Sequence, residues 1–281
     1  MLPRYGFVGL LIILTAKPLM FMRVEPVATW FTPIVWTGYI LFADSLVLKL
    51  SGRSLIVNQR RQFLMMIPLS VGFWLIFEYY NLYLRNWYYV NLPEQLWLRE
   101  IGFFWSFATI MPGLFETADL LKALGTFAGA SMKKVSLTRS RLYVSIAVGL
   151  IFLAGPLFLP YSVRPYTFGF VWLGFFLLLA PVNYILDGHS LLEDWERGNW
   201  ERTYCLLASG LICGLLWEFW NYWATAKWIY AVPILSEVKI FEMPLLGFLG
   251  FPPFALEYFE MYNFASKSLK GFCHSGSDVL Q

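Results

Sequence analysis

The stretch that decides the fold is FEYYNLYLRNWYYVNLP, residues 77–93, because much of it recurs as WEFWNYWATAKWIYAVP at residues 217–233. Both copies place a glutamate and an asparagine three residues apart, Glu78 with Asn81 and Glu218 with Asn221. Each pair is followed by a tryptophan, a tyrosine two residues later and a proline, namely Trp87, Tyr89 and Pro93, then Trp228, Tyr230 and Pro233. We interpret this recurrence as a duplicated unit.

The sequence around both copies is strongly apolar. Hydrophobic residues make up 58%, aromatic residues 20% and charged residues only 14%, with a mean hydropathy of +0.58. These values exceed those of ordinary soluble proteins. Apolar windows long enough to cross a bilayer core of about 30 Å lie at 5–22, 28–48, 62–84, 97–118, 142–159, 166–186, 203–226 and 241–264. The sequence therefore predicts an all-α polytopic membrane protein with eight transmembrane helices.

Shorter matches extend the duplication beyond the opening stretch. AKPLMF at 16–21 answers AGPLFL at 154–159, and VWTG at 35–38 answers VWLG at 171–174. We expect two tandem four-helix repeats at 1–121 and 142–266, a cytoplasmic linker at 122–141 and a polar C-terminal tail at 267–281. An even number of crossings gives both repeats one orientation, so their symmetry axis is expected along the membrane normal.

The positive charges predict the orientation. An eight-helix topology places 14 of the 21 Lys and Arg residues on the side that holds both termini. The positive-inside rule makes that side cytoplasmic, and we expect an integral protein of a bacterial inner membrane. The net charge of +3 is explained by loops beside anionic lipid, so no nucleic-acid partner is expected.

The duplicated motif predicts a site within the membrane. Residues three apart share one helix face, so carboxylate and amide point the same way in each copy. Glu100 and Glu242 stand where the fourth and eighth helices are expected to begin. We expect these two and the motif glutamates to be catalytic in an aromatic-lined chamber. The catalytic candidates are Glu78, Glu218, Glu100 and Glu242, and the substrate-binding candidates are Asn81, Asn221, Trp87, Tyr89, Trp228, Tyr230 and Trp217.

A second acidic layer is expected nearer the cytoplasm. Glu116 and Glu257 are its candidate members, whereas Asp119 and Glu260 are interpreted as solvated helix ends. A carboxylate at membrane depth costs about 2.5–3.5 kcal/mol and usually faces the protein interior. In its neutral form it is a proton donor, and aromatic faces stabilise a cation formed beside it. The alternative interpretation is that Glu and Asn connect helices and the aromatics form an interfacial belt.

The order of these motifs resembles the membrane lycopene cyclases of the heterodimeric and fused type. The resemblance rests on Glu78, WYY at 87–89 and REIGFF at 99–104, then Glu218, WIY at 228–230 and FEMPLLGF at 241–248. It implies two similar helical halves and a cofactor-independent isomerase of carotenoid biosynthesis. Such an enzyme protonates a linear carotenoid end and closes its ring with essential acidic residues.

Three classes of function remain open at this stage. The first is an acid-catalysed isomerase or cyclase of a carotenoid or other isoprenoid, with membrane lipid and a hydrophobic small molecule as partners. The second is a small-solute or proton-coupled transporter, which breaks in the helices would favour, and the third is a noncatalytic membrane subunit. No nucleotide, metalloprotease or hydrolase motif occurs, so no cofactor and no metal are expected. The sequence leaves the oligomeric state open.

Overall fold

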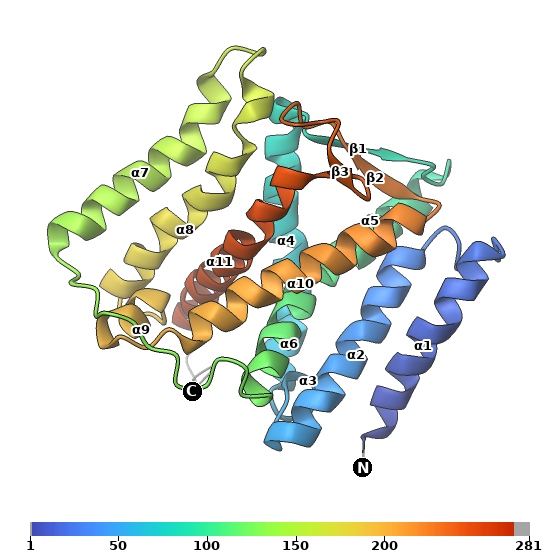
Figure 1. Cartoon of the computed structure of the whole chain (residues 1–281), viewed down its shortest axis with the longest axis horizontal. Coiled ribbons are helices and arrows are strands. Elements are labelled where there is room, and N and C mark those ends of the chain that lie inside the picture. The colour runs from blue at the N-terminus through green and yellow to red at the C-terminus, as the bar shows by residue number, and fades with distance from the viewer. Residues whose placement is uncertain (1, 273–281) are drawn as a thin grey trace.

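The computed structural model describes residues 2–272 and shows an almost entirely helical chain (Figure 1). The helices of the first part are α1 (Arg4–Phe21), α2 (Phe31–Ser51), α3 (Leu55–Asn58), α4 (Arg60–Leu84), α5 (Leu96–Ala108) and α6 (Ile110–Ala123). Those of the second part are α7 (Arg139–Phe158), α8 (Phe168–Ile185), α9 (Leu191–Arg197), α10 (Glu201–Trp223) and α11 (Phe251–Phe272), with 3₁₀ turns η1 (Arg164–Tyr166) and η2 (Leu245–Gly250). The short strands are β1 (Trp87–Val90), β2 (Lys227–Tyr230), β3 (Lys239–Ile240) and β4 (Met243–Pro244). The all-α prediction is confirmed.

Six helices in the described part of the chain are long and apolar enough to cross a membrane, namely α1, α2, α4, α7, α8 and α10. Large apolar side chains on the outer helices are exposed, among them Phe7, Leu11 and Leu14 on α1 and Ile151 and Phe158 on α7. Exposed apolar faces of this extent are typical of helices that contact lipid. These helices support an integral membrane protein.

Two helix pairs flank the molecule, α1 with α2 and α7 with α8 (Figure 1). Glycines allow the close approach in both pairs, since Gly9 lies against the backbone of Gly38 and Gly149 lies against that of Gly174. A Cβ at Gly149 would come within 2.6 Å of the Leu178 amide nitrogen. Small residues at such crossings are typical of helix packing in membranes.

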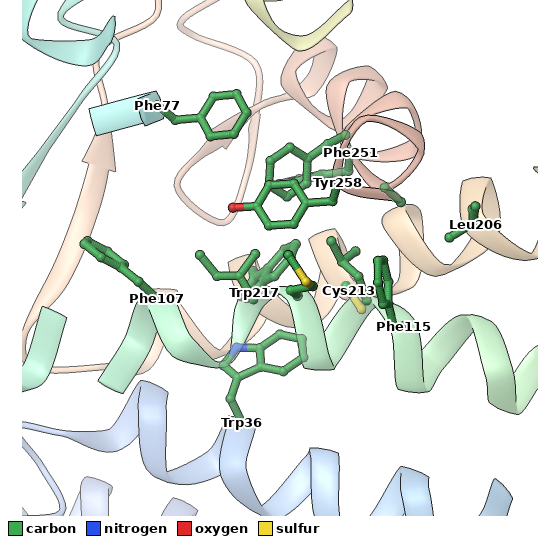
Figure 2. Close-up of a cluster of buried hydrophobic side chains, with 14 of the residues drawn as sticks. Trp36, Phe77, Phe107, Phe115, Leu206, Cys213, Trp217, Phe251 and Tyr258 are labelled. Carbon is green, nitrogen blue, oxygen red and sulfur yellow. The ribbon is translucent and has the colours of Figure 1, made fainter. Parts of the chain in front are cut away.

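The centre of the molecule is aromatic and is built from α2, α4, α6, α10 and α11. Figure 2 shows Trp36 of α2 rising toward Trp217 of α10, with Phe251 and Tyr258 of α11 on the far side. The Trp36 ring lies 5.1 Å from Trp217 and 4.9 Å from Trp220, measured between centroids. Offset and edge-to-face aromatic pairs of this kind add to the stabilisation that comes from burial alone.

The fourth apolar window, 97–118, is not one helix but two, which meet at Thr109. In a continuous helix the Met111 amide would donate to the Phe107 carbonyl. The hydroxyl of Ser70 from α4 lies between these groups instead, donating to Phe107 O over 2.5 Å and accepting from Met111 N over 3.0 Å. Pro112 also lacks the N–H that would bond to the Ala108 carbonyl, so the break is stable.

The eighth window, 241–264, is helical only from Phe251 onward. Residues before it form the β3–β4 hairpin and the η2 turn, and a side chain at Gly250 would overlap the Trp172 ring. Pro252 and Pro253 stand in the first turn of α11, where amide donors have no helical partner to lose. Glu242 therefore lies in a hairpin turn and does not begin a helix, and the described residues provide six single-helix candidate spans in place of eight.

The connection between α6 and α7 and the end of α11 complete the fold. The connection between α6 and α7 follows the start of α10, with hydrogen bonds from Met132 N to Gly198 O and from Trp200 N to Ala130 O. Helix α11 continues to Phe272, beyond the end of the expected apolar window at 264 and of the expected repeat at 266. The rest of the expected polar tail, 273–281, lies outside the described residues.

Candidate functional site

A two-stranded ladder joins the two copies of the duplicated motif. Strands β1 and β2 are antiparallel, and their register pairs Trp87 with Tyr230 and Tyr89 with Trp228. Each tryptophan of one copy is thus opposite the tyrosine of the other. The ladder lies at the end of the molecule opposite the start of α1 (Figure 1).

The motif asparagines hold both strands to their helices in the same way. The Asn81 amide donates to Trp87 O over 2.8 Å and its oxygen accepts from Trp87 N over 3.1 Å. The Asn221 amide donates to Trp228 O over 2.8 Å and its oxygen accepts from Trp228 N over 3.0 Å. Because a strand this short has few ladder bonds, each asparagine fixes the direction in which its strand leaves the helix.

Glu78 is half-buried and is held by three donors on a single oxygen. Its Oε1 accepts from the indole nitrogens of Trp74 (2.8 Å) and Trp87 (3.1 Å) and from the hydroxyl of Tyr89 (2.5 Å). Burial raises the pKa of the Tyr89 phenol well above its usual range, and the charge of the nearby Glu78 carboxylate adds to the rise. Tyr89 therefore remains a protonated hydrogen-bond donor at neutral pH.

Glu218 is fully buried and has a simpler environment. Its Oε1 accepts from the Tyr230 hydroxyl over 2.8 Å, and that hydroxyl in turn accepts from the Trp228 indole nitrogen over 3.0 Å. Its Oε2 has no hydrogen-bond partner among the described residues. Burial also raises the pKa of the Tyr230 phenol well above its usual range.

An aromatic pocket lies beneath this ladder, between α2, α5 and α10, and contains about 1190 Å³ of empty space including its open mouth. Tryptophans dominate its lining, namely Trp30, Trp36, Trp74, Trp87, Trp172, Trp217 and Trp228. Tyr89 and Tyr230 also line it, whereas Glu78 and Glu218 stand behind them. No carboxyl group of the described chain belongs to the lining, although the cations Arg99 and Lys227 do.

The structure brings together most of the sequence-predicted site residues. Trp217 lines the pocket with the four aromatic residues of the strands, while Asn81 and Asn221 support those strands from behind. Glu242 forms a 2.6 Å ion pair with Lys227, so it neutralises one of the two lining cations. Glu100 is exposed, and its carboxylate is 4.0 Å from the Arg99 guanidinium.

The second acidic layer lies away from this pocket. Glu116 and Glu257 are fully buried, and neither carboxyl group has a hydrogen-bond partner in the described chain. The interpretation of Glu260 as a solvated end is wrong, because it is fully buried. It accepts from Asn183 Nδ2 over 2.7 Å and from Leu191 N over 2.9 Å, which attaches the start of α9 to α11.

Sequence reasoning missed two groups of residues. One is Asp44 on α2, which is buried and accepts from the Tyr5 hydroxyl over 2.5 Å and from Ile56 N over 2.9 Å. Its signal was a single charge within the apolar window 28–48. The other is the opposite side of the pocket. It is built by Trp30 and Thr32, which belong to neither copy of the motif, and by Arg99, the first residue of REIGFF, for which no role was expected.

Comparison with known proteins adds no relative. No protein-family model matches the chain, and no match was found among the curated proteins or the solved structures. The fold and site define a helical protein with candidate membrane spans, buried carboxylates and a large aromatic cluster.

Proposed function

We propose that the chain is an intramembrane isomerase that protonates a linear isoprenoid and closes or shifts its double bonds. The observation that carries this proposal is that each motif glutamate accepts a hydrogen bond from a tyrosine that lines one aromatic pocket. A carboxyl group one hydroxyl away from a π-rich cavity is placed to deliver a proton through that hydroxyl. Indole faces around the cavity favour the carbocation that forms.

The two glutamates differ in a way that assigns their roles. Glu218 has one donor and a second oxygen without a partner, and complete burial favours its neutral acid form. Glu78 receives three donors on one oxygen, which favours the charged form. Glu218 is therefore the acid and Glu78 the base of the proposed reaction.

The proposed reaction balances without a cofactor. In the neutral form of Glu218 the hydrogen bond to Tyr230 first reverses: Glu218 donates to the Tyr230 oxygen, and the Tyr230 hydroxyl turns its proton into the pocket. Tyr230 then transfers that proton to an alkene carbon of the substrate while Glu218 transfers its own to the Tyr230 oxygen. A second double bond attacks the resulting cation and closes the ring. A proton is then lost from a neighbouring carbon to the pair Tyr89 and Glu78, so the product has the formula of the substrate. Exchange with solvent restores the starting protonation.

We further propose that the architecture is a duplication whose halves are related by an axis along the membrane normal. Its support is the equivalence of the asparagine and tyrosine hydrogen bonds in the two copies, together with the self-complementary register of β1 and β2. In this arrangement α5–α6 and η2–α11 are the interrupted fourth helices of the two repeats. The termini are cytoplasmic in the orientation that the charge distribution predicts, which puts the pocket in the outer half of the membrane.

The resemblance to lycopene cyclases supports the same chemistry through short motifs only. A second candidate function is transport of a small solute, and the observation in its favour is the helix break at Thr109 beside the pocket. The Ser70 hydroxyl occupies both backbone groups at that break, so they are not free to coordinate a solute. Because both backbone groups at the break are already hydrogen-bonded, the isomerase is the better proposal.

The test is expression in hosts that accumulate lycopene or other linear isoprenoids, followed by chromatography and mass analysis of the extracted lipids. The wild type should give a product of unchanged mass and altered retention. Glu218→Gln should lower its formation by about 10²- to 10⁴-fold, as expected for loss of a general acid. Glu237→Gln, which changes an exposed carboxylate outside the pocket, is the matched control and should match the wild type. No new product from any substrate with well-expressed protein would reject the isomerase.

A further inference from the structure

The aromatic pocket has two walls of different chemistry. On the wall formed by β1 and β2, the side-chain donors find acceptors within the protein. Tyr89 and Trp87 donate to Glu78, Tyr230 donates to Glu218, and Trp228 donates to Tyr230. This wall therefore offers a ligand π faces and little unsatisfied hydrogen-bonding capacity.

The opposite wall, formed by the start of α2 and one face of α5, has the reverse character. Trp30 Nε1, Thr32 Oγ1, Trp36 Nε1 and Arg99 Nε are all buried and have no hydrogen-bond partner among the described residues. All four side chains line the pocket. We call this set the donor wall.

The geometry of the two elements brings the donor wall together. Thr32 and Trp36 are one turn apart on α2 and share a face. Arg99 and Gly102 are likewise neighbours on α5, and a Cβ at Gly102 would lie 3.3 Å from Trp30 Nε1. The α5 face that holds Arg99 is thus packed against Trp30. Thr32 is only 8% exposed and Trp36 is fully buried.

The chemistry of these groups specifies what is missing. An indole nitrogen and a guanidinium are donors only, so the complementary groups must be acceptors. Buried donors in folded proteins are nearly always paired, and an unpaired one is costly. Among the described residues the pocket lining contains no carboxylate, and the ion-pair partner of Arg99 is the exposed Glu100, 4.0 Å away. The Arg99 side chain is 39% exposed and has Glu100 beside it, so water and Glu100 compensate part of its charge. The acceptors for the buried Arg99 Nε, the two indole nitrogens and the Thr32 hydroxyl must still come from outside the described residues.

We infer that the pocket takes an amphipathic isoprenoid whose anionic, oxygen-bearing head group binds the donor wall while its apolar chain lies along the tryptophan faces. Carboxylates and phosphates share this head-group chemistry, since a guanidinium binds either of them. The inference rests on the part of the proposed function that makes the pocket a ligand site, and it does not depend on proton transfer. It excludes a pure hydrocarbon as the preferred ligand.

The test measures binding of three polyenes with one conjugated chain to the purified full chain in nanodiscs. The probes are retinoic acid, retinyl phosphate and the parent hydrocarbon axerophthene, each followed by quenching of tryptophan fluorescence. The acid or the phosphate should bind at least roughly tenfold more tightly than the hydrocarbon, since hydrogen bonds to charged groups are strong. Which of the two binds better distinguishes the carboxylate from the phosphate.

Variants of the donor wall show whether the preference arises there. Thr32→Val and Arg99→Met should each weaken binding of the anionic probe by roughly tenfold while leaving the hydrocarbon unchanged. Lys239→Gln, a cation at the same end of the molecule but outside the lining, is the control and should leave all three affinities unchanged. Equal binding of hydrocarbon and anions, or an unchanged preference in both variants, would overturn the inference.

The two proposals fail in different ways. Selective anion binding that persists in Glu218→Gln, with no conversion of any substrate, would retain the head-group inference and reject the isomerase. Conversion of a hydrocarbon without any anion preference would retain the isomerase and reject the head-group inference. Failure of all three polyenes to bind the folded protein would overturn the head-group inference, and the isomerase would still be decided by conversion of linear isoprenoids.

Discussion

Removal of the Asn221 side chain should destabilise the protein strongly. Asn221 is fully buried, and its amide group satisfies both the N–H and the C=O of Trp228. Asn221→Ala leaves these two part-buried peptide groups without their side-chain partner. At about 1–3 kcal/mol for each unsatisfied group, the expected loss is about 2–6 kcal/mol. This is a large share of a total stability of about 5–15 kcal/mol.

The equivalent substitution in the other copy provides an internal comparison. Asn81 makes the same two bonds to Trp87 and a third to Asn86 N, but it is partly exposed. Water can replace part of the hydrogen bonding that Asn81→Ala removes, so the loss in free energy of unfolding should be smaller than for Asn221→Ala. Gln95→Ala changes an exposed amide near the strands and should stay within about 0.5 kcal/mol of the wild type.

The assay is unfolding in mixed detergent micelles, monitored by tryptophan fluorescence across a denaturant titration. The midpoints should fall in the order Gln95→Ala, Asn81→Ala, Asn221→Ala, from highest to lowest. A free energy of unfolding for Asn221→Ala within about 0.5 kcal/mol of the wild type would refute the view that the asparagines hold the strands.

Three further predictions concern packing, the helix break and topology. Gly149→Val should destabilise the α7–α8 pair and lower the thermal midpoint, because the added Cβ would meet the Leu178 backbone. Gly155→Val on the same helix is the control: a Cβ there meets nothing within 4 Å, so the thermal midpoint should change little. Ser70→Ala should cost about 2–6 kcal/mol in the same unfolding assay, because it leaves two buried backbone groups unpaired at the Thr109 break. A neutral effect would contradict the bridging role. Reporter fusions at residue 133 should report the cytoplasm, and an outside signal would reject the proposed orientation.

The helical class and many of the site residues could be predicted from the sequence, because composition and a duplicated motif are local signals. It placed Glu78 and Glu218 on helices and their aromatic partners just after them, as the structure has them. The pairing of β1 with β2 was not predictable, since two four-residue strands 140 residues apart pair only when the helices bring them together. Whether these residues act on a substrate stays a prediction.

The interrupted helices show where apolar composition misleads. Window 97–118 looks like one span, but its break depends on Ser70, which lies on a different helix. The donor wall was missed for a related reason. Trp30, Thr32 and Trp36 look like an ordinary apolar helix entry in the sequence, and only the packing of α5 against them shows that their donors have no partner.

Protonation of the substrate is the central claim, and solvent deuterium measures it most directly. Membranes containing the wild-type chain should convert a linear isoprenoid in D₂O to a product that carries one deuterium on carbon, because the proton of Glu218 exchanges with solvent before it reaches the alkene. Glu218→Gln should form no labelled product above background, and Glu237→Gln should label as the wild type does. A rearranged product that contains no deuterium, or labelling that is unchanged in Glu218→Gln, would contradict proton delivery from Glu218 through Tyr230.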